Sequence, residues 1–482
     1  MNEIKFTTYN LSEDILKALE LLNFSNPTKV QQEVIPVILK KQDIIVKSQT
    51  GSGKTGSFAI PLTELVEWEE NKPQVLVLTP TRELAMQVKD DFFNIGRYKR
   101  LKVPAVFGKD SFEKQEKQLK QKSHVVVGTP GRTIDHIERG TIDLSEIKYL
   151  VIDEADEMLN MGFVDQIETI ITNLPKDRVT MLFSATMPKD IELLCKKYMN
   201  KPLRVEIESE SSAIDRITQE RYEVRNSRDK NSLLNDLLVV ENPDSCIIFC
   251  NTRQMVDDVN EEMTSIKSTC ETIHGGMEQR DRQRVMNDFK LGYFRYLVAT
   301  DVAARGIDID DISLVINYDL PREKESYVHR IGRTGRIGRE GKAITFVTRN
   351  ERESLKDIEQ YIERSIPVKD RPGISAVENA QSAFNKTINT RPEIREEKGA
   401  ELNKDIMKIH INAGKKQKMR PVDIVGTLCN IDGVTKDDIG IINILDISTF
   451  VEILNNKGEL VHKSLQKKPL KGRLRRVSKV LE

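Results

Sequence analysis

The chain has 482 residues, which is enough for two or three domains that each bury a core. Its 75 Lys and Arg balance 75 Asp and Glu, and 38% of its residues are hydrophobic, so we expect a soluble globular protein. No stretch approaches the roughly 18 apolar residues of a membrane-spanning helix, and the N-terminal residues do not resemble a secretory signal. These features favour a cytoplasmic protein with no membrane partner. The five cysteines are scattered and form no C-x-x-C pair, which argues against a disulfide framework or a zinc site.

Short, β-rich apolar runs alternate with helical stretches from residue 43 onward. Because the runs are continuous rather than alternating, they are typical of parallel strands that are covered on both faces. The first set of predicted strands is Asp43–Lys47, Val75–Thr79, Val103–Val106, Val125–Val127, Tyr149–Asp153 and Val179–Phe183. A second set is Ser245–Cys250, Tyr296–Thr300, Ser313–Asn317 and Lys342–Val347. The sequence therefore predicts two α/β domains in tandem, at 1–207 and 216–366, joined by a polar and acidic linker at 208–215.

Residues 367–403 lose this periodicity and contain three prolines, so we predict a flexible tether with some helix near Glu396–Leu402. Beyond it, residues 404–482 carry strand signals for one small third domain, at Lys408–Asn412, Ile439–Leu445 and Phe450–Leu454. From Lys404 to the end there are sixteen Lys and Arg against nine Asp and Glu, a local net charge of +7 that leaves −7 elsewhere. This asymmetry indicates a C-terminal module that binds nucleic acid.

Residues 48–55 read Ser-Gln-Thr-Gly-Ser-Gly-Lys-Thr between a predicted strand and a helix, which is the context of a phosphate-binding loop. Backbone N–H groups and the helix N-terminus would bind the phosphates, and Lys54 would reach the outer ones. Thr55 would ligate Mg²⁺, the only metal that the sequence implies. The nucleotide-binding residues of this loop are Gln49, Thr50, Gly51, Ser52, Gly53, Lys54 and Thr55.

About a hundred residues later, Asp153-Glu154-Ala155-Asp156 ends another buried strand. Asp153 would hold the metal through water, and Glu154 would polarise the attacking water. Each motif alone could be an ordinary Gly-rich or acidic turn, but together they favour a nucleoside triphosphatase.

In order along the chain, these and further motifs resemble the DEAD-box ATP-dependent RNA helicases. The motifs that carry the resemblance are Asn23–Gln31 with Phe6 before it, Pro80–Ala85, Thr129–Arg132, Ser184–Thr186, Val298–Asp308 and His329–Arg336. Asn23 and Lys109 stand where the family usually has glycine. The resemblance implies two RecA-like domains that close over ATP, Mg²⁺ and one RNA strand.

The resemblance also implies residue roles. Gln31 and Phe6 would read adenine, Asp308 would contact the nucleotide, and Arg333 and Arg336 would be arginine fingers beside Lys54 and Glu154. Asp156, Ser184 and Thr186 would couple hydrolysis to duplex opening. The implied RNA contacts of the two domains are Thr81, Arg82, Thr129, Gly131, Arg132 and Thr300. Taken singly, a Thr-Arg turn is more often a helix cap followed by a solvated charge.

In the third domain, the segments Asp405–Gly414, Arg420–Gly426 and Asp437–Gly440 resemble the RNA-binding domain of the DbpA (YxiN) subgroup. In that subgroup the domain is a divergent RRM of α+β fold that binds a hairpin of 23S ribosomal RNA. This implies a part in large-subunit ribosome assembly. Since Phe450 is the only aromatic residue after Leu402, we expect recognition through phosphates and loops rather than base stacking. The expected RNA-binding residues are Lys467, Lys468, Arg473, Arg475 and Arg476.

The predicted function is that of an ATP-dependent RNA helicase that opens short RNA duplexes locally. Two alternatives remain open: a DNA-directed translocase on the same scaffold, and an ATP-gated RNA clamp or assembly scaffold in which unwinding is incidental. The sequence shows no heptad pattern, so a monomer is expected.

Overall fold

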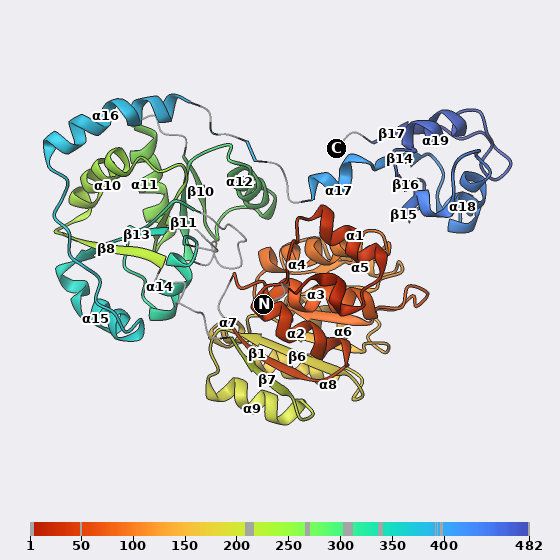
Figure 1. Cartoon of the computed structure of the whole chain (residues 1–482), viewed down its shortest axis with the longest axis horizontal. Coiled ribbons are helices and arrows are strands. Elements are labelled where there is room, and N and C mark those ends of the chain that lie inside the picture. Colours follow the sequence, from red (N-terminus) through yellow and green to blue (C-terminus); the bar gives the residue numbers. More distant parts are fainter. Residues whose placement is uncertain are drawn as a thin grey trace.

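The computed structural model describes residues 4–48, 51–207, 216–265, 270–301, 312–335, 341–390, 392, 394–395 and 399–480. Figure 1 shows two large α/β domains side by side and a smaller module at the C-terminal end of the chain. Among the described residues, no helix is long and apolar enough to cross a membrane.

The first domain is built on a parallel sheet of seven strands in the order β3-β4-β2-β5-β6-β1-β7. Its strands are β1 (Ile44–Lys47), β2 (Val75–Leu78), β3 (Ala105–Val106), β4 (Val125–Gly128), β5 (Tyr149–Ile152), β6 (Val179–Ser184) and β7 (Leu203–Glu206). Its helices are α1 (Glu13–Leu21), α2 (Lys29–Leu39), α3 (Lys54–Leu65), α4 (Arg82–Ile95), α5 (Phe112–Leu119), α6 (Pro130–Glu138), α7 (Ala155–Asn160), α8 (Val164–Thr172) and α9 (Lys189–Tyr198). All six predicted strands are present, and β7 is added at the edge.

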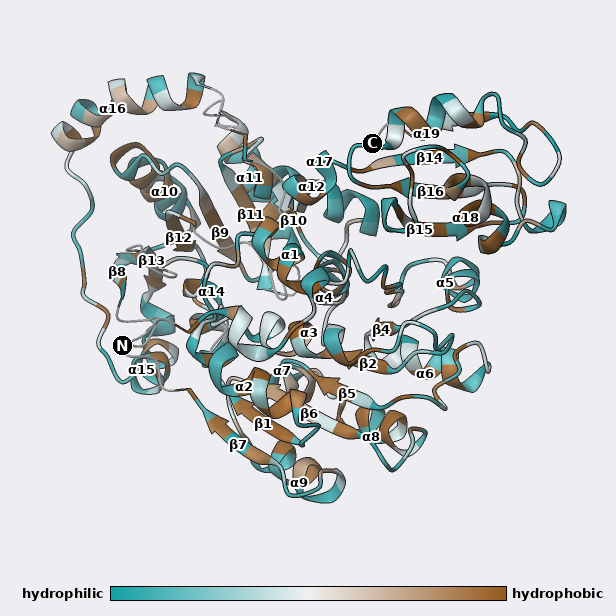
Figure 2. Cartoon of the chain, turned by 45° about the vertical axis from the view of Figure 1, so that its right-hand side comes forward, coloured by the Kyte–Doolittle hydropathy of each residue, from teal (hydrophilic) through white to brown (hydrophobic). Residues whose placement is uncertain are grey.

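Successive residues of each strand enter different cores, because side chains alternate between the two faces of a sheet. In β1, Ile44 and Val46 join one buried cluster while Ile45 joins the other. Figure 2 shows the same distribution as brown strands inside both large domains and teal residues on the outer helices. Covering on both faces explains why the strands read as continuous apolar runs.

The second domain has a parallel sheet of six strands in the order β10-β11-β9-β12-β13-β8. Its strands are β8 (Ile217–Val224), β9 (Cys246–Cys250), β10 (Cys270–Ile273), β11 (Tyr296–Thr300), β12 (Leu314–Asn317) and β13 (Gly341–Thr348). Its helices include α10 (Ser227–Glu241), α11 (Arg253–Ser265), α12 (Gln279–Leu291), α14 (Lys324–Ile331) and α15 (Arg352–Tyr361). The four predicted strands are present, β8 and β10 are added at the two edges, and the predicted linker 208–215 lies outside the described residues.

The prediction of a flexible tether over 367–403 is wrong for much of that segment. Residues Ile374–Asn389 form a helix, α16, that packs on α10 of the second domain. Phe384 is 3% exposed, and Val377, Ala380 and Ile388 pack against the same core. Their spacing follows one face of a helix, and these few apolar contacts order a segment whose composition suggested disorder. A short helix, α17 (Ala400–Lys404), lies near the helix expected at Glu396–Leu402.

The C-terminal module is an antiparallel sheet of four strands in the order β15-β16-β14-β17, with two helices over one face. Its elements are β14 (Met407–Ile411), α18 (Pro421–Cys429), β15 (Ile439–Ile444), β16 (Thr449–Ile453), α19 (Gly458–Leu465) and β17 (Val477–Lys479). The three predicted strands are present. The fourth strand, β17, lies in the basic C-terminal stretch and was not predicted.

Candidate nucleotide and RNA site

Sheet order brings the motifs of the first domain together. Strands β5, β6 and β1 are adjacent, so the residues that follow their carboxyl ends meet at one edge of the sheet. These are the acids from Asp153 onward, the Ser184 element and the phosphate-binding loop that leads into α3. Loops at this edge can therefore form one site, although their sequence positions span more than a hundred residues.

The phosphate-binding loop is held by its own lysine. Lys54 is 7% exposed, and its Nζ donates to the carbonyl of Ser48 at 3.1 Å. Gly51 and Gly53 have φ of 78° and 92°, a region that glycine adopts without a steric penalty. Gln49 and Thr50 lie outside the described residues. The remaining loop residues bring backbone N–H groups and an ammonium group to the N-terminus of α3.

Gln31 ties the N-terminal motif to this loop. Its Oε1 accepts from the Thr28 backbone N–H at 3.0 Å, and its Nε2 donates to the Gly53 carbonyl at 3.2 Å. Thr28 Oγ1 also donates to the Ser52 carbonyl at 2.9 Å. An amide has two N–H donors and two lone pairs, so Gln31 retains one of each for a ligand.

Phe6 lies in the core of the first domain at 4% exposure and packs edge-on against Phe24, with ring centroids 6.1 Å apart. Both residues line a cavity of about 580 Å³ beside the motif. Asn23, which also lines it, has φ of 59°. Asparagine tolerates this left-handed conformation better than most residues, which explains how it replaces the usual glycine.

The two acids after β5 are both shifted by burial, but different charges oppose the shift. Burial raises the pKa of Asp153 to about 7, although Lys54 opposes the rise. Burial also raises the pKa of Glu154, and here the charges of Lys54, His329 and Arg333 oppose it. Glu154 has φ of 52°, and such a strained backbone in a non-glycine residue is typical of functional sites.

Asp156 joins this turn to the element after β6. Its Oδ2 accepts from the backbone N–H groups of Ala185 and Thr186 at 3.1 and 2.8 Å, and from Thr186 Oγ1 at 3.0 Å. Ser184 Oγ accepts from the Asp156 backbone N–H at 3.2 Å and donates to the Thr186 carbonyl at 2.6 Å. The predicted coupling residues therefore form one hydrogen-bonded unit.

The second domain faces this edge with α14 and the turn that follows it. His329 Nδ1 lies 2.9 Å from Glu157 Oε1, and Arg333 is 7% exposed, with its Nε donating to the His329 carbonyl at 3.2 Å. Since Arg333 influences the pKa of Glu154, the predicted finger lies near the predicted catalytic acid. Arg336 and Asp308 lie outside the described residues.

Arg330, the first arginine of the same segment, is buried and holds neighbouring loops of the second domain together. It is 2% exposed, and its guanidinium bonds Asp301 Oδ2 at 2.7 Å, Asn251 Oδ1 at 2.9 Å and the Asp319 carbonyl at 2.7 Å. These partners follow the adjacent strands β11, β9 and β12. Arg330 thus connects the loops that follow these three strands, and it lies three residues before Arg333 in the chain.

A second contact between the domains involves Arg82 and Glu83 at the start of α4. Arg282 Nη2 of α12 lies 2.8 Å from Glu83 Oε1, with side-chain exposures of 8% and 13%, and Arg82 Nη1 donates to Gln279 Oε1 at 3.1 Å. Burial lowers the pKa of the Arg82 guanidinium; Glu83 opposes this, and Arg282 and Arg132 add to it. Three arginines from two domains therefore gather at this point.

The other predicted RNA-binding residues of the core have mixed environments. The Thr81 hydroxyl caps α4 by accepting from Leu84 N–H at 3.2 Å, while Gly131 is exposed at the start of α6 and Thr129 is its N-cap. Arg132 is anchored within its domain, by the Asp110 carbonyl at 3.1 Å and Gln115 Oε1 at 3.0 Å. Thr300, the last of the predicted core contacts, is buried at 8% exposure. The predicted basic residues of the module are mostly exposed: Lys467, Lys468, Arg473 and Arg476 are open to solvent, and Arg475 is half-buried.

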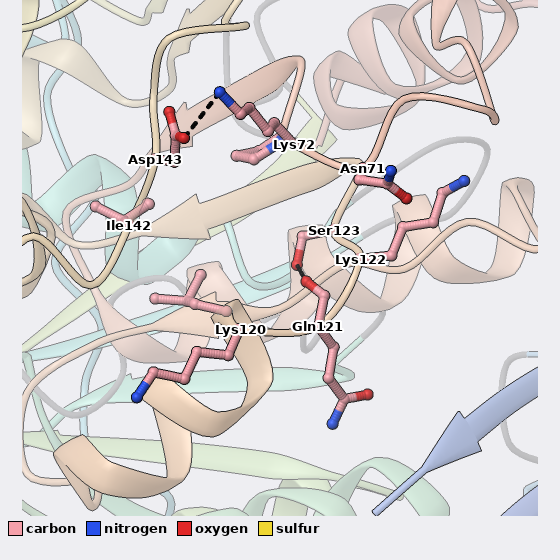
Figure 3. A pocket seen from close by; sticks show the side chains of 10 residues that line it. Asn71, Lys72, Lys120, Gln121, Lys122, Ser123, Ile142 and Asp143 are labelled. Atoms are coloured by element: carbon pink, nitrogen blue, oxygen red, sulfur yellow. Dashed lines mark hydrogen bonds and ion pairs between the residues drawn. The ribbon is translucent and has the colours of Figure 1, made fainter. Parts of the chain in front are cut away.

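A further cavity of about 320 Å³ lies at the opposite edge of the first sheet, before β2, β4 and β5. Figure 3 shows Lys72 directed at Asp143, 2.9 Å from its Oδ2, while Lys120 and Gln121 point away from that pair. Because its lining residues precede these strands, the cavity lies at their amino ends and is separate from the motif edge.

Sequence reasoning missed the pairs that join the domains, His329–Glu157 and Arg282–Glu83, and the buried role of Arg330. The acidic residue next to each motif was the available signal, because Glu83 and Glu157 directly follow residues that were singled out. Their partners are distant in sequence, and nothing local indicates them.

Together, the two RecA-like domains, the phosphate-binding loop, the paired acids and the facing arginine define a nucleotide hydrolase of the two-domain helicase class. The family models agree: residues 28–194 match the DEAD/DEAH box helicase, 229–338 the helicase conserved C-terminal domain and 408–479 the DbpA RNA binding domain. The chain belongs to the DEAD-box ATP-dependent RNA helicases of the DbpA subgroup.

Individual relatives agree with this assignment. The chain is 58% identical to the ATP-dependent RNA helicase DbpA of Bacillus subtilis, over 98% of this chain and 99% of that protein. It is 44% identical to the DEAD-box ATP-dependent RNA helicase CshA of Geobacillus kaustophilus, over 75% and 77% of the two chains. Among solved structures, Saccharomyces cerevisiae Dbp5 bound to RNA and ADP BeF₃ aligns with a TM-score of 0.71 and 32% identity, over 80% of this chain and 100% of that one.

Proposed function

We propose that this RNA helicase hydrolyses ATP between its two domains and uses the C-terminal module to act on 23S ribosomal RNA during large-subunit assembly. The observation that carries the proposal is the contact across the domain boundary: His329 Nδ1 lies 2.9 Å from Oε1 of Glu157, three residues after Glu154, and the charges of His329 and Arg333 oppose the rise in the pKa of Glu154. An arginine supplied in this way stabilises phosphoryl transfer and is worth about 10³–10⁵ in rate.

Thr55 and Asp153 would hold Mg²⁺. The buried carboxyl of Asp153, with its pKa raised to about 7, fits a site that a cation completes. In the described part of the chain, no group of three or more acidic, histidine or cysteine side chains is arranged so that it could hold a metal ion; Mg²⁺ usually takes only one or two carboxylates together with phosphates and waters. When bound, Mg²⁺ would neutralise charge on the phosphates.

Within this proposal, Glu154 orients the attacking water, and Lys54 contacts the outer phosphates. Gln31 reads the adenine with its remaining donor and acceptor, and the cavity beside Phe6 supports a base at that end. By resemblance, Gln49, Thr50, Asp308 and Arg336 complete the nucleotide contacts.

One RNA strand would cross the two domains beside the arginine cluster. The lowered pKa of Arg82 reflects a desolvated charge among like charges, which a phosphate would relieve. We further assign Thr81, Thr129, Gly131, Arg132 and Thr300 to this strand, with Arg132 holding its loop rather than projecting freely. Asp156, Ser184 and Thr186 would transmit closure of the two domains to the RNA strand, because they connect the turn of Asp153–Asp156 to the end of β6.

The module would give the specificity. Its match to the DbpA RNA binding domain and its exposed basic residues support binding of a ribosomal hairpin through phosphates. The proposal also includes action in the cytoplasm, where the ribosomal substrate would be met, and a monomeric state, because the sequence shows no heptad pattern. The residues we assign to this contact are Lys467, Lys468, Arg473, Arg475 and Arg476.

Steady-state ATPase activity without RNA, with a generic RNA, and with a 23S fragment that contains the peptidyl-transferase hairpins tests the proposal. We expect strong stimulation by the ribosomal fragment only. Lys467→Gln combined with Arg473→Gln should weaken that stimulation and leave the RNA-free rate unchanged. Equal stimulation by every RNA would refute the ribosomal assignment, and slow RNA release in ATP without unwinding would favour a clamp.

A further inference from the structure

The first domain presents three cations to the C-terminal module just after α4. Arg97 Nη1 lies 3.3 Å from Glu452 Oε1, Arg100 Nη2 donates to the Lys436 carbonyl at 2.8 Å, and Lys102 Nζ donates to the Ile442 carbonyl at 2.9 Å. The partners are one carboxylate and two backbone carbonyls of the module. Three closely spaced cations that all find acceptors on one body indicate a specific interface rather than a chance approach.

The central pair of this interface is buried. Arg97 and Glu452 have side-chain exposures of 6% and 10%. The Arg97 guanidinium also lies 4.7 Å from the centroid of the Phe93 ring, and its Nη2 donates to Asn403 Oδ1 at 3.2 Å. Glu452 Oε2 accepts from the Ile441 backbone N–H at 3.3 Å. Both charges are thus desolvated and hydrogen-bonded, and removing either partner leaves the other buried without compensation.

Helix α17 adds an apolar part to the same contact. It packs on α1 of the first domain, and its Leu402 is 1% exposed. The residue that follows the helix, Asp405, is tied to the module, because its carbonyl accepts from Asn456 N–H at 3.0 Å. Burial, and after it the charge of Asp405, raises the pKa of Tyr98 in the first domain. The segment that enters the module therefore lies against the first domain.

The interface covers a particular part of the module. Strand β15 is an edge strand, whose free carbonyls usually face water or another strand. Glu452 lies on β16 and, by strand alternation, shares the face of Phe450, which lies 5.0 Å from the His410 ring. In RRM modules this open face of the sheet stacks RNA bases.

We propose that the first domain and the C-terminal module form a fixed dock, with Arg97–Glu452 at its centre. The edge strand β15 and the Glu452 end of the sheet face bind protein instead of RNA. RNA is left with the surfaces that remain open, including the basic segment 463–479. A docked module also holds its RNA at a constant distance from the motif edge, whereas a module on a free tether would not. The dock itself does not depend on which RNA is bound.

Figures 1 and 2 agree on this arrangement: in both views the module lies beside the first domain, next to α17 and on the side of α1 and α4, while α9 lies at the far end of that domain. This geometry supplies a matched control. Lys196 on α9 is exposed, so Lys196→Glu reverses the same charge far from the module.

The test is single-molecule energy transfer between a dye on Cys429, which is exposed in α18, and one on Lys40→Cys, at an exposed position after α2. The otherwise unchanged chain and Lys196→Glu should give one narrow population with the same transfer efficiency. Arg97→Glu and Glu452→Arg should each raise the undocked fraction by at least about 100-fold, since two like charges then face each other in a buried contact. The double reversal should restore the narrow population.

The RNA-free ATPase rate checks that the core is folded, because neither residue belongs to the nucleotide site. Arg97→Met and Glu452→Gln serve as milder variants if a reversal prevents folding, and small-angle X-ray scattering of the unlabelled chain should show expansion on undocking. A broad population in the unsubstituted chain would overturn the proposal. So would Arg97 and Glu452 variants that behave like Lys196→Glu.

Discussion

The buried pair between Glu83 and Arg282 should control how often the two domains are closed. Removing one partner of such a pair costs about 3–5 kcal/mol, chiefly because the other charge stays buried and unpaired. The contact is 2.8 Å long with exposures of 13% and 8%, so this range applies in the closed state. When the domains separate, both side chains regain water, and the penalty therefore falls on closure alone.

With 1.4 kcal/mol for each factor of ten, a loss of about 3 kcal/mol lowers the closed-to-open ratio about 100-fold. Glu83→Gln should therefore weaken RNA-stimulated ATP turnover by up to about two orders of magnitude, because turnover needs Arg333 near Glu154. RNA-free nucleotide binding to the first domain should change little, since Glu83 does not line the phosphate-binding loop.

The assay combines energy transfer between dyes on the two domains, with RNA and an ATP analogue present, and steady-state ATPase rates. Arg282→Met should reproduce the effect of Glu83→Gln, and the double variant should cost clearly less than the sum of the two. Arg284→Met is the matched control, because Arg284 lies on the same helix with 54% exposure. Strict additivity, or a Glu83→Gln variant no weaker than the control, would refute the reasoning.

Four further predictions concern single residues. Asp156→Asn replaces an oxygen that accepts three hydrogen bonds, so unwinding per ATP hydrolysed should fall at least about tenfold in a paired unwinding and ATPase assay. Lys109→Gly should stabilise the first domain by about 1 kcal/mol in urea unfolding, because Lys109 has φ of 58°, where glycine pays no steric cost. Burial lowers the pKa of His124 from 6.5 to about 4, so as the pH falls the unfolded chain binds this proton before the folded chain does. The free energy of unfolding should therefore fall as the pH drops from 6.5 to about 4. Between pH 7 and 5 the loss should be about 2 kcal/mol, and it should be smaller in His124→Asn. Phe384→Ala should destabilise the second domain by about 3 kcal/mol, and an unchanged midpoint would mean that α16 contributes nothing to it.

The sequence was most informative where one motif or one buried run carries the signal. The runs around Ile45 and Val151 are apolar on both faces, so their strands were predicted within a residue or two. Four edge strands, β7, β8, β10 and β17, were missed, whereas the edge strands β3 and β15 were predicted. In β8, for example, buried and exposed residues alternate from Ile217 to Gln219, and this pattern is weaker than a continuous run.

Backbone conformation, and contacts between residues far apart in the sequence, could not be predicted from local sequence patterns. Asn23 and Lys109 were recognised as standing at usual glycine positions, but only the structure gives them φ of 59° and 58°. Arg97 and Glu452 are separated by 355 positions, and neither belongs to a motif. The roles of the site residues follow from the ordered set of motifs, whereas the contacts that orient them arise from packing.

Arg330 gives the second domain a mechanical property. Its guanidinium grips Asp301, the residue after Thr300, and three residues later the chain reaches Arg333. A position expected to touch RNA and one expected to touch the terminal phosphate are thus linked by a short stretch of chain and by one ion pair, in which Arg330 is buried and Asp301 is partly exposed. RNA bound at Thr300 and nucleotide bound at Arg333 would therefore act on two ends of one connected segment. A shift at either residue would be transmitted to the other through Asp301 and Arg330, without movement of the whole domain.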